Sequence, residues 1–244
     1  MTAQDNAVSS RRVILGVFAH PDDETSGCGG TFTKYAAQGV DIHVITATRG
    51  ELGTLGTGDM HLTREELPAV RESELRTVLR SYGVNPPILF DYRDQEVKDA
   101  DPDEVAEKVL SVMLDVRPHV VITFGPMGIS QHDDHVAMHR AALAAFDRYR
   151  PQAANVPRLF YIAIPKEIAQ AFGIPLEGPE AEPTTIIDIS DTKAVKVQGL
   201  RTYASQKDAQ ELADRFSQME FSIESFHQAY PPVADGLISG GFWE

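Results

Sequence analysis

Residues 13–24 read VILGVFAHPDDE, an apolar run that ends directly in a cluster of histidine and acidic residues. A second cluster, His132-Asp133-Asp134-His135, follows the mostly apolar residues 120–124 across a Gly-Pro-Met-Gly loop. Short apolar runs of this kind are typical of buried parallel strands. Ligands of open α/β sheets collect beyond the carboxyl ends of such strands. We therefore expect the two clusters to form one metal site.

The chain around the first cluster alternates strand and helix patterns. We predict strands at residues 13–18, 40–48, 88–90, 119–124, 158–164 and 184–189, and helices at 31–38, 64–82, 102–116 and 135–149. Gly39 and Gly83 stand where helices should end, and Pro118 follows a third helix end. The alternation predicts right-handed βαβ units. We expect an α/β, Rossmann-like layered fold with a mostly parallel sheet and helices on both faces.

The C-terminal part is less regular. We expect residues 176–183, rich in Pro, Gly and Glu, to form a surface excursion, and residues 191–228 to form two helices broken near Ser205. A chain of 244 residues with 42% hydrophobic content is long enough to bury one full core. We expect a single domain over residues 1–244.

Composition argues against several classes of partner. The chain has 36 acidic and 22 basic residues, a formal charge of -14, which opposes binding to nucleic acid or to an anionic membrane surface. Cys28 is the one cysteine, so an intramolecular disulfide is excluded. Residues 1–12 lack a signal peptide pattern, and no apolar run approaches the length of a membrane span. We expect a cytoplasmic protein.

The chemistry of both clusters suits a hydrolytic metal site. Zinc in hydrolases commonly binds three protein ligands from His, Asp and Glu and leaves a fourth position for water. Pro21 lies between His20 and the two aspartates and fixes the backbone angle φ there. His20 and Asp23 can therefore point into one cavity, while Asp22 projects towards water bound on the metal. His132 and His135 are three residues apart at a loop-to-helix junction, which places both on one face of a helical turn. One of them can bind metal while the other faces substrate.

Each cluster by itself also fits a structural role, since acidic residues after a strand often cap the next helix and histidines are often satisfied in the core. The two together, both at strand ends and both mixing His with Asp, favour the metal site. The remaining histidines lack such neighbours and are left outside the site: His43, His61, His119, His139 and His227.

The first cluster resembles the (P/A)HPDDE signature, and the second the HPDH signature, of the LmbE-like, or PIG-L, zinc deacetylases. That family removes acetyl groups from N-acetylglucosamine units. Residues 27–31 match its glycine-rich turn, Gly50-Glu51 its Gly-Glu loop, and residues 71–75 its Arg-x-x-Glu-Leu helix. The same order of motifs makes the deacetylases of mycothiol and bacillithiol synthesis particularly similar within the family.

The resemblance implies a metal site with a general base beside it. His20, Asp23 and His135 match the residues that hold Zn²⁺, with Fe²⁺ as the alternative metal. Asp22 matches the general base that activates water. Relatives of this type act on a small N-acetylated sugar and often assemble as homo-oligomers, which we also expect here.

The resemblance assigns four further residues. His132 would stabilise the oxyanion, and Asp134 would hydrogen-bond His132 and set its tautomer. Arg71 and Asp94 match residues that bind sugar hydroxyls.

Two positions depart from the family pattern. Asp133 stands where proline is usual, and we expect it to start a helix, although a carboxylate close to His132 would instead raise the pKa of that imidazole. Ser130 stands where mycothiol-type deacetylases carry a tyrosine.

Cys28 could be a soft metal ligand, but between glycines it is better interpreted as a small buried filler.

We predict a hydrolase that removes the N-acetyl group from a GlcNAc-type glycoside, with zinc-activated water and Asp22 as base. An amidase of thiol conjugates, or a deacetylase of another secondary metabolite, would share the site and differ in substrate. A catalytically silent metal- or sugar-binding protein would not need the acid at Asp22, so we disfavour it.

Overall fold

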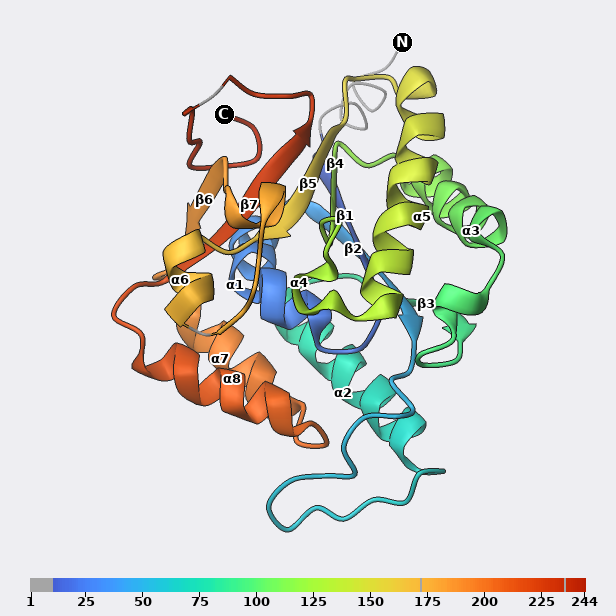
Figure 1. Cartoon of the computed structure of the whole chain (residues 1–244), viewed down its shortest axis with the longest axis vertical. Helices are drawn as coiled ribbons and strands as arrows, with labels where there is room; N and C mark the ends of the chain where they lie inside the picture. Colours follow the sequence, from blue (N-terminus) through green and yellow to red (C-terminus); the bar gives the residue numbers. More distant parts are fainter. Residues whose placement is uncertain (1–10, 172, 235) are drawn as a thin grey trace, which may run out of the picture.

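The computed structural model describes residues 11–171, 173–234 and 236–244, and its strands form one sheet in the order β3-β2-β1-β4-β5-β7-β6 (Figure 1). Strands β1 to β5 pair in parallel, while β7 runs antiparallel to both β5 and β6. The predicted, mostly parallel sheet is confirmed. The strands are β1 (Val13–Phe18), β2 (Asp41–Thr48), β3 (Ile88–Tyr92), β4 (Val120–Thr123), β5 (Arg158–Ala163), β6 (Thr185–Asp188) and β7 (Ile223–Tyr230).

Helices cover both faces of the sheet, as predicted. Figure 1 shows α3 and α5 together on one side and α1, α2, α7 and α8 on the other. Because both faces are covered, the middle strands β1 and β4 are almost entirely buried. The helices are α1 (Asp23–Ala37), α2 (Leu67–Tyr82), α3 (Pro102–Val116), α4 (Gly128–Gln131), α5 (Asp133–Tyr149), α6 (Lys166–Ala171), α7 (Lys193–Thr202) and α8 (Lys207–Gln218), with short 3₁₀ segments η1 (Val97–Asp99), η2 (Arg150–Gln152) and η3 (Gly178–Ala181).

The first helix begins earlier than predicted. The glycines that were expected to form a turn before residue 31 lie inside α1. A Cβ atom on Gly27 would overlap Ile162 of β5, and one on Gly30 would lie 2.7 Å from Cδ1 of Ile189. The glycines therefore allow the helix to pack close to its neighbours, and they do not form a turn.

The prediction of helix up to residue 228 is wrong for residues 223–228. These residues belong to β7, which fills the gap between β5 and β6. Ile223, Phe226 and Tyr230 have the spacing of a helical face, which explains the error. Pairing with two neighbouring strands outweighs this local pattern. The predicted helix break near Ser205 is confirmed, because α7 ends at Thr202 and α8 begins at Lys207.

Within the described part of the chain, no helix combines the length and the apolar character that crossing a membrane requires. Residues 1–10, on which part of the signal-peptide argument depends, lie outside the described residues. The single domain stays an interpretation.

The strand order places the two clusters side by side. From β1 the chain continues outward through β2 and β3, whereas β4 lies on the other side of β1 and continues to β5. The carboxyl ends of β1 and β4 are therefore neighbours at the point where the sheet changes its direction of winding. This is the usual ligand position in such sheets.

Candidate metal centre and active site

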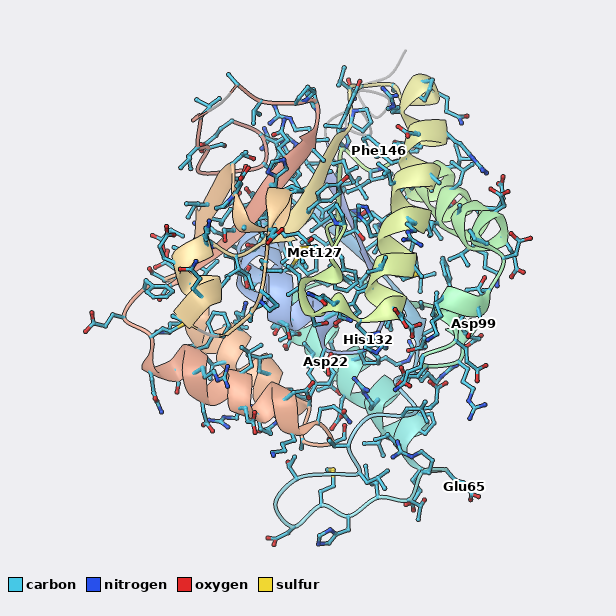
Figure 2. The ribbon with its side chains drawn as sticks, viewed as in Figure 1. Asp22, Glu65, Asp99, Met127, His132 and Phe146 are labelled. Carbon is cyan, nitrogen blue, oxygen red and sulfur yellow. The ribbon has the colours of Figure 1, made fainter. Side chains whose placement is uncertain are left out.

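The three predicted metal ligands converge beyond the ends of β1 and β4. Nδ1 of His20 lies 3.1 Å from Nε2 of His135, and Oδ1 of Asp23 lies 3.3 Å from the same Nε2. Oδ2 of Asp23 lies 3.6 Å from Nδ1 of His20 and accepts the backbone N–H of His20 at 2.7 Å. Figure 2 labels Asp22 and His132 at this end of the sheet. The side chains come from the loop after β1 and from the first turns of α1 and α5.

The other contacts of both imidazoles fix which nitrogen is free to bind a cation. Nε2 of His20 faces two carboxylates, Asp94 at 3.2 Å and Asp134 at 3.3 Å, so it carries a proton. Nδ1 of His135 lies 2.9 Å from the carbonyl oxygen of Gly128 and donates to it. The lone pairs of His20 Nδ1 and His135 Nε2 then face each other beside the Asp23 carboxylate. Such a donor set fits a divalent metal ion with two nitrogen ligands and one oxygen ligand.

Burial disfavours the charge of Asp23, but the hydrogen bonds and the positive charge of His135 and His20 in their protonated forms outweigh burial and hold the pKa of Asp23 well below its usual value. An ionised carboxylate is the form that binds metal.

The prediction that the Asp134 carboxylate contacts His132 is wrong, because the carboxylate contacts His20 instead. The carboxylate of Asp134 is fully buried and lies on His20, and it also accepts the backbone N–H groups of Gln95 at 2.7 Å and Val97 at 3.1 Å. These backbone donors, in the segment after β3, draw the side chain across to His20. Asp134 therefore orients a metal-binding candidate, as carboxylates behind metal-bound histidines commonly do.

His132 is the N-cap residue of α5, and its Nδ1 accepts the backbone N–H of Asp134 at 3.2 Å. Its ring centroid lies 4.7 Å from that of His20 and 5.1 Å from that of His135. Nitrogen atoms of the three histidines lie within 4.8 Å of one another, so His132 is a further candidate ligand by distance. Burial lowers the pKa of His132, and nearby His20 and His135 lower it further. With Nδ1 accepting, a neutral His132 carries its proton on Nε2.

Asp22 lies beside the three converging ligands in a left-handed backbone conformation, with φ of 105°. Its Oδ2 lies 2.9 Å from Nη2 of Arg71. Burial raises the pKa of Asp22 well above its usual value, and the Arg71 charge partly offsets this effect. A carboxylate with a raised pKa beside a metal centre is suited to proton transfer.

Arg71 and Asp94, the predicted sugar-binding pair, both contact the predicted metal and base residues. Arg71 is only 4% exposed and donates to the carbonyl oxygens of Gly50 and Pro21 as well as to Asp22. Asp94 places one oxygen on His20 and accepts the N–H of Leu52 with the other, at 2.9 Å. In this structure they position Asp22 and His20. Their contact with sugar hydroxyls stays a prediction.

Two buried acids support the site and were not assigned by the sequence analysis. Glu24 is fully buried and accepts the N–H of Asp22 at 3.0 Å and the hydroxyl of Tyr203 at 2.6 Å. Glu180, in η3, accepts the N–H groups of Met127 at 2.6 Å and Ile129 at 2.9 Å, in the loop that leads to His135. Residues 176–183 are therefore not only a surface excursion.

The sequence signals for these two acids differ in strength. Glu24 ends the first cluster and could have been assigned from its position there. Glu180 lies in an irregular segment far along the chain, which offered no such signal.

The two departures from the family pattern have different surroundings. Asp133 is the first residue of α5, is exposed and pairs with Lys98 at 2.8 Å, in agreement with the expected helix start. The hydroxyl of Ser130 lies 3.4 Å from Nδ1 of His135. Cys28 is buried in the core, where burial raises the pKa of its thiol, as expected for a filler.

A family model described as GlcNAc-PI de-N-acetylase (PIG-L) matches residues 15–146, more than half of the 244-residue chain. The chain belongs to this family. Every predicted site residue lies in the matched stretch. Membership in the PIG-L family confirms the family predicted from the sequence and the class of hydrolytic N-deacetylase.

Two relatives extend the similarity beyond that stretch. The 1D-myo-inositol 2-acetamido-2-deoxy-alpha-D-glucopyranoside deacetylase of Rhodococcus opacus is 32% identical, over 82% of each chain. The enzyme of the same name from Kineococcus radiotolerans is 33% identical, over 80% of this chain and 69% of its own.

Solved structures share the fold. The N,N'-diacetylchitobiose deacetylase of Pyrococcus horikoshii gives a TM-score of 0.71 at 22% identity, covering 91% of this chain and 85% of its own. The 4-carboxy-2-hydroxymuconate hydratase GalB of Pseudomonas putida gives 0.68 at 20% identity, covering 93% of this chain and 99% of its own. Since deacetylases and a hydratase share this fold, the fold alone does not identify the reaction, which has to be inferred from the residues of the site.

Proposed function

We propose that this PIG-L family member is a metal-dependent N-deacetylase that removes the acetyl group from a GlcNAc-type glycoside, with Zn²⁺ as the metal and Fe²⁺ as the other candidate. The observation that carries the proposal is the pair of imidazole nitrogens, His20 Nδ1 and His135 Nε2, 3.1 Å apart beside Asp23. The relatives from Rhodococcus and Kineococcus support the substrate class, because their names describe deacetylases of an N-acetylglucosamine unit on inositol.

His20, Asp23 and His135 would hold the metal. A bound zinc ion polarises a carbonyl group and lowers the pKa of a coordinated water to about 7. Asp94 and Asp134 hold the proton of His20 on Nε2, so that its Nδ1 is free to bind the metal. The carbonyl oxygen of Gly128 holds the proton of His135 on Nδ1, so that its Nε2 is free.

Asp22 would take the proton of the attacking water. Its Oδ2 is held by Arg71, which leaves Oδ1 for proton transfer. After the amide carbon has gained its fourth substituent, the same carboxyl returns the proton to the leaving nitrogen. This transfer allows the C–N bond to break with a neutral amine as product.

His132 would stabilise the charge that develops on the carbonyl oxygen. Because its Nδ1 accepts the N–H of Asp134, its Nε2–H is free to donate to that oxygen. A donor fixed before the reaction lowers the barrier without reorganisation in the transition state.

The proposal is tested with metal-loaded protein and a panel of N-acetylglucosaminides that includes the inositol glycoside. The Asp22→Asn variant should retain one equivalent of metal and lose about 10²–10⁴-fold in kcat, because it cannot accept a proton. Released primary amine measures turnover, and elemental analysis measures metal. A fully active Asp22→Asn variant contradicts the assigned base, and a fully active, metal-retaining His135→Ala variant contradicts the metal site.

A further inference from the structure

An apolar cavity of about 340 Å³ adjoins the metal centre, on the side lined by Asp22, Asp23 and His135. Its walls come from the end of β5, from α6 and the residues around it, from the start of β7, and from α8, where Lys196 of α7 lies over the ring of Phe216. The apolar side chains that form these walls include Ile162, Ile164, Ile168, Ile174, Leu212 and Phe216. The cavity is thus continuous with the position where the scissile amide has to lie.

The opposite side of the metal centre is polar. Beyond Nε2 of His20 lie the carboxylates of Asp94 and Asp134, and the backbone N–H of Asp94 donates to Glu51 at 3.1 Å. Arg49 pairs with Glu72 on the same rim. Asp134 is fully buried and Asp94 is 5% exposed, so the partly exposed Glu51 and Arg49 are the groups that sugar hydroxyls would contact on this side.

Two polar groups of the cavity lining, Lys196 and Ser225, already have hydrogen-bond partners within the protein. Lys196 donates to the carbonyl oxygen of Ser26 at 2.7 Å and to Glu224 at 2.6 Å, and the hydroxyl of Ser225 donates to Ala163 at 2.8 Å. A polar occupant would therefore lose water without gaining a partner at these two positions. The apolar side chains that form most of the lining favour an apolar occupant.

Most of the apolar wall lies outside the stretch that carries the family match. That stretch ends at residue 146 and contributes Phe124 and Ile129 to the lining, whereas the other apolar wall residues named above begin at Ile162. The C-terminal part of the chain therefore supplies most of the apolar wall.

We propose that this cavity binds the acyl chain of the scissile amide, so that the enzyme hydrolyses N-acyl amino sugars with hydrocarbon chains longer than acetyl. The inference rests on the proposed function. With the sugar on the polar side, the acyl group is the substituent that points across the metal centre. Cavities of roughly 300–1,000 Å³ hold drug-sized ligands, so 340 Å³ far exceeds the needs of one methyl group.

The reaction is the same hydrolysis. Water supplies a hydroxyl group to the acyl carbon and a proton to the nitrogen, and the C–N bond breaks. The products are a free amino sugar and a fatty acid, with no oxidant or further reactant.

The first experiment measures kcat/KM of the metal-loaded enzyme for N-acetyl, N-butyryl, N-hexanoyl, N-octanoyl and N-decanoyl glucosamine. Each added methylene should raise kcat/KM about fourfold until the cavity is filled, from the free energy of burying one methylene. A steady fall in kcat/KM from acetyl onward overturns the proposal. If kcat/KM instead increases for octyl glycosides of N-acetylglucosamine and not for the N-octanoyl sugar, the cavity binds the aglycone. That result also overturns the proposal.

A matched pair of variants tests the wall. Leu212→Glu places a charge in the cavity and should lower the octanoyl-to-acetyl ratio of kcat/KM at least tenfold. Leu114→Glu makes the same change at an exposed leucine of α3 and should leave that ratio unchanged. Equal ratios in both variants contradict the assignment.

Binding separates this inference from the proposed function. Calorimetry with metal-loaded Asp22→Asn protein should show N-octanoyl glucosamine binding at least tenfold more tightly than N-acetyl glucosamine, with a negative heat-capacity change. If the wild-type protein hydrolyses neither sugar but the variant shows this binding preference, the proposed deacetylase activity is refuted and the acyl-binding cavity is supported. An active deacetylase without the preference refutes the cavity alone.

Discussion

Asp22 has a backbone conformation that residues other than glycine rarely adopt, with φ of 105°. Such a conformation costs about 1–3 kcal/mol and persists only where the surroundings hold it. The carboxylate of Glu24 accepts the backbone N–H of Asp22, and Tyr203 in turn holds Glu24. The last acid of the first cluster therefore holds the backbone of Asp22 in place, and both of its oxygens are engaged by protein groups.

Glu180 should make stability depend on pH. Burial raises the pKa of Glu180 above its usual value, although backbone N–H groups oppose this. The native state then binds the proton more tightly than the unfolded state, so the contribution of Glu180 to the free energy of unfolding falls as the pH rises from about 4.3 through the raised pKa. The free energy of unfolding of the wild type minus that of Glu180→Gln should decrease over this range. Urea denaturation of metal-free protein measures it, and a difference that rises with pH contradicts the assignment.

At the scale of elements, helix α1 is held at its middle by two buried charges. Glu224 of β7 accepts the N–H groups of Gly30 at 3.0 Å and Thr31 at 2.7 Å, while Lys196 of α7 donates to the carbonyl oxygen of Ser26. These contacts tie α1, α7 and β7 together. The bonds from Gly30 and Thr31 lie where the sequence pattern predicted the helix to begin, at residue 31.

Lys196→Met should lower the free energy of unfolding by about 3–5 kcal/mol, because it leaves the buried Glu224 carboxylate without its cation. Adding Glu224→Gln to this variant should restore part of the loss, since no unpaired charge then remains. Chemical denaturation of both variants measures the two effects. A double variant less stable than Lys196→Met would show that Glu224 acts mainly through its bonds to the α1 backbone.

Periodicity predicted most elements because most are amphipathic or fully apolar over their length. It failed for β7, where Ile223, Phe226 and Tyr230 mimic a helical face and only the neighbouring strands decide the conformation. It also failed at the start of α1, because glycine is a poor helix former whose value here lies in close packing.

At the scale of the whole molecule, the proposed metal site joins two distant segments of the chain. His20 follows β1, and His135 follows β4 on α5. Bound metal should therefore stabilise the fold, by about 2.7 kcal/mol when free metal is a hundredfold above Kd, or about 5–10 °C in Tm. Thermal denaturation with zinc and with chelator measures the shift. His135→Ala should show none, and a full shift in that variant contradicts the site.

The homo-oligomer expected from the family resemblance stays a prediction. Light scattering on a size-exclusion column decides between monomer and oligomer. The net charge of -14 opposes association at low salt, so the measurement belongs at physiological ionic strength.

The sequence by itself determined the fold class, the family and the residues of both clusters, because strand hydrophobicity and the order of His and Asp are local properties. Only the tertiary structure decided which atoms meet. The backbone donors of Gln95 and Val97 bring Asp134 to His20, and Arg71 reaches Asp22 from α2. The apolar cavity likewise depends on how β5, α6 and α8 pack, because side chains distant in sequence line one space only after the chain has folded.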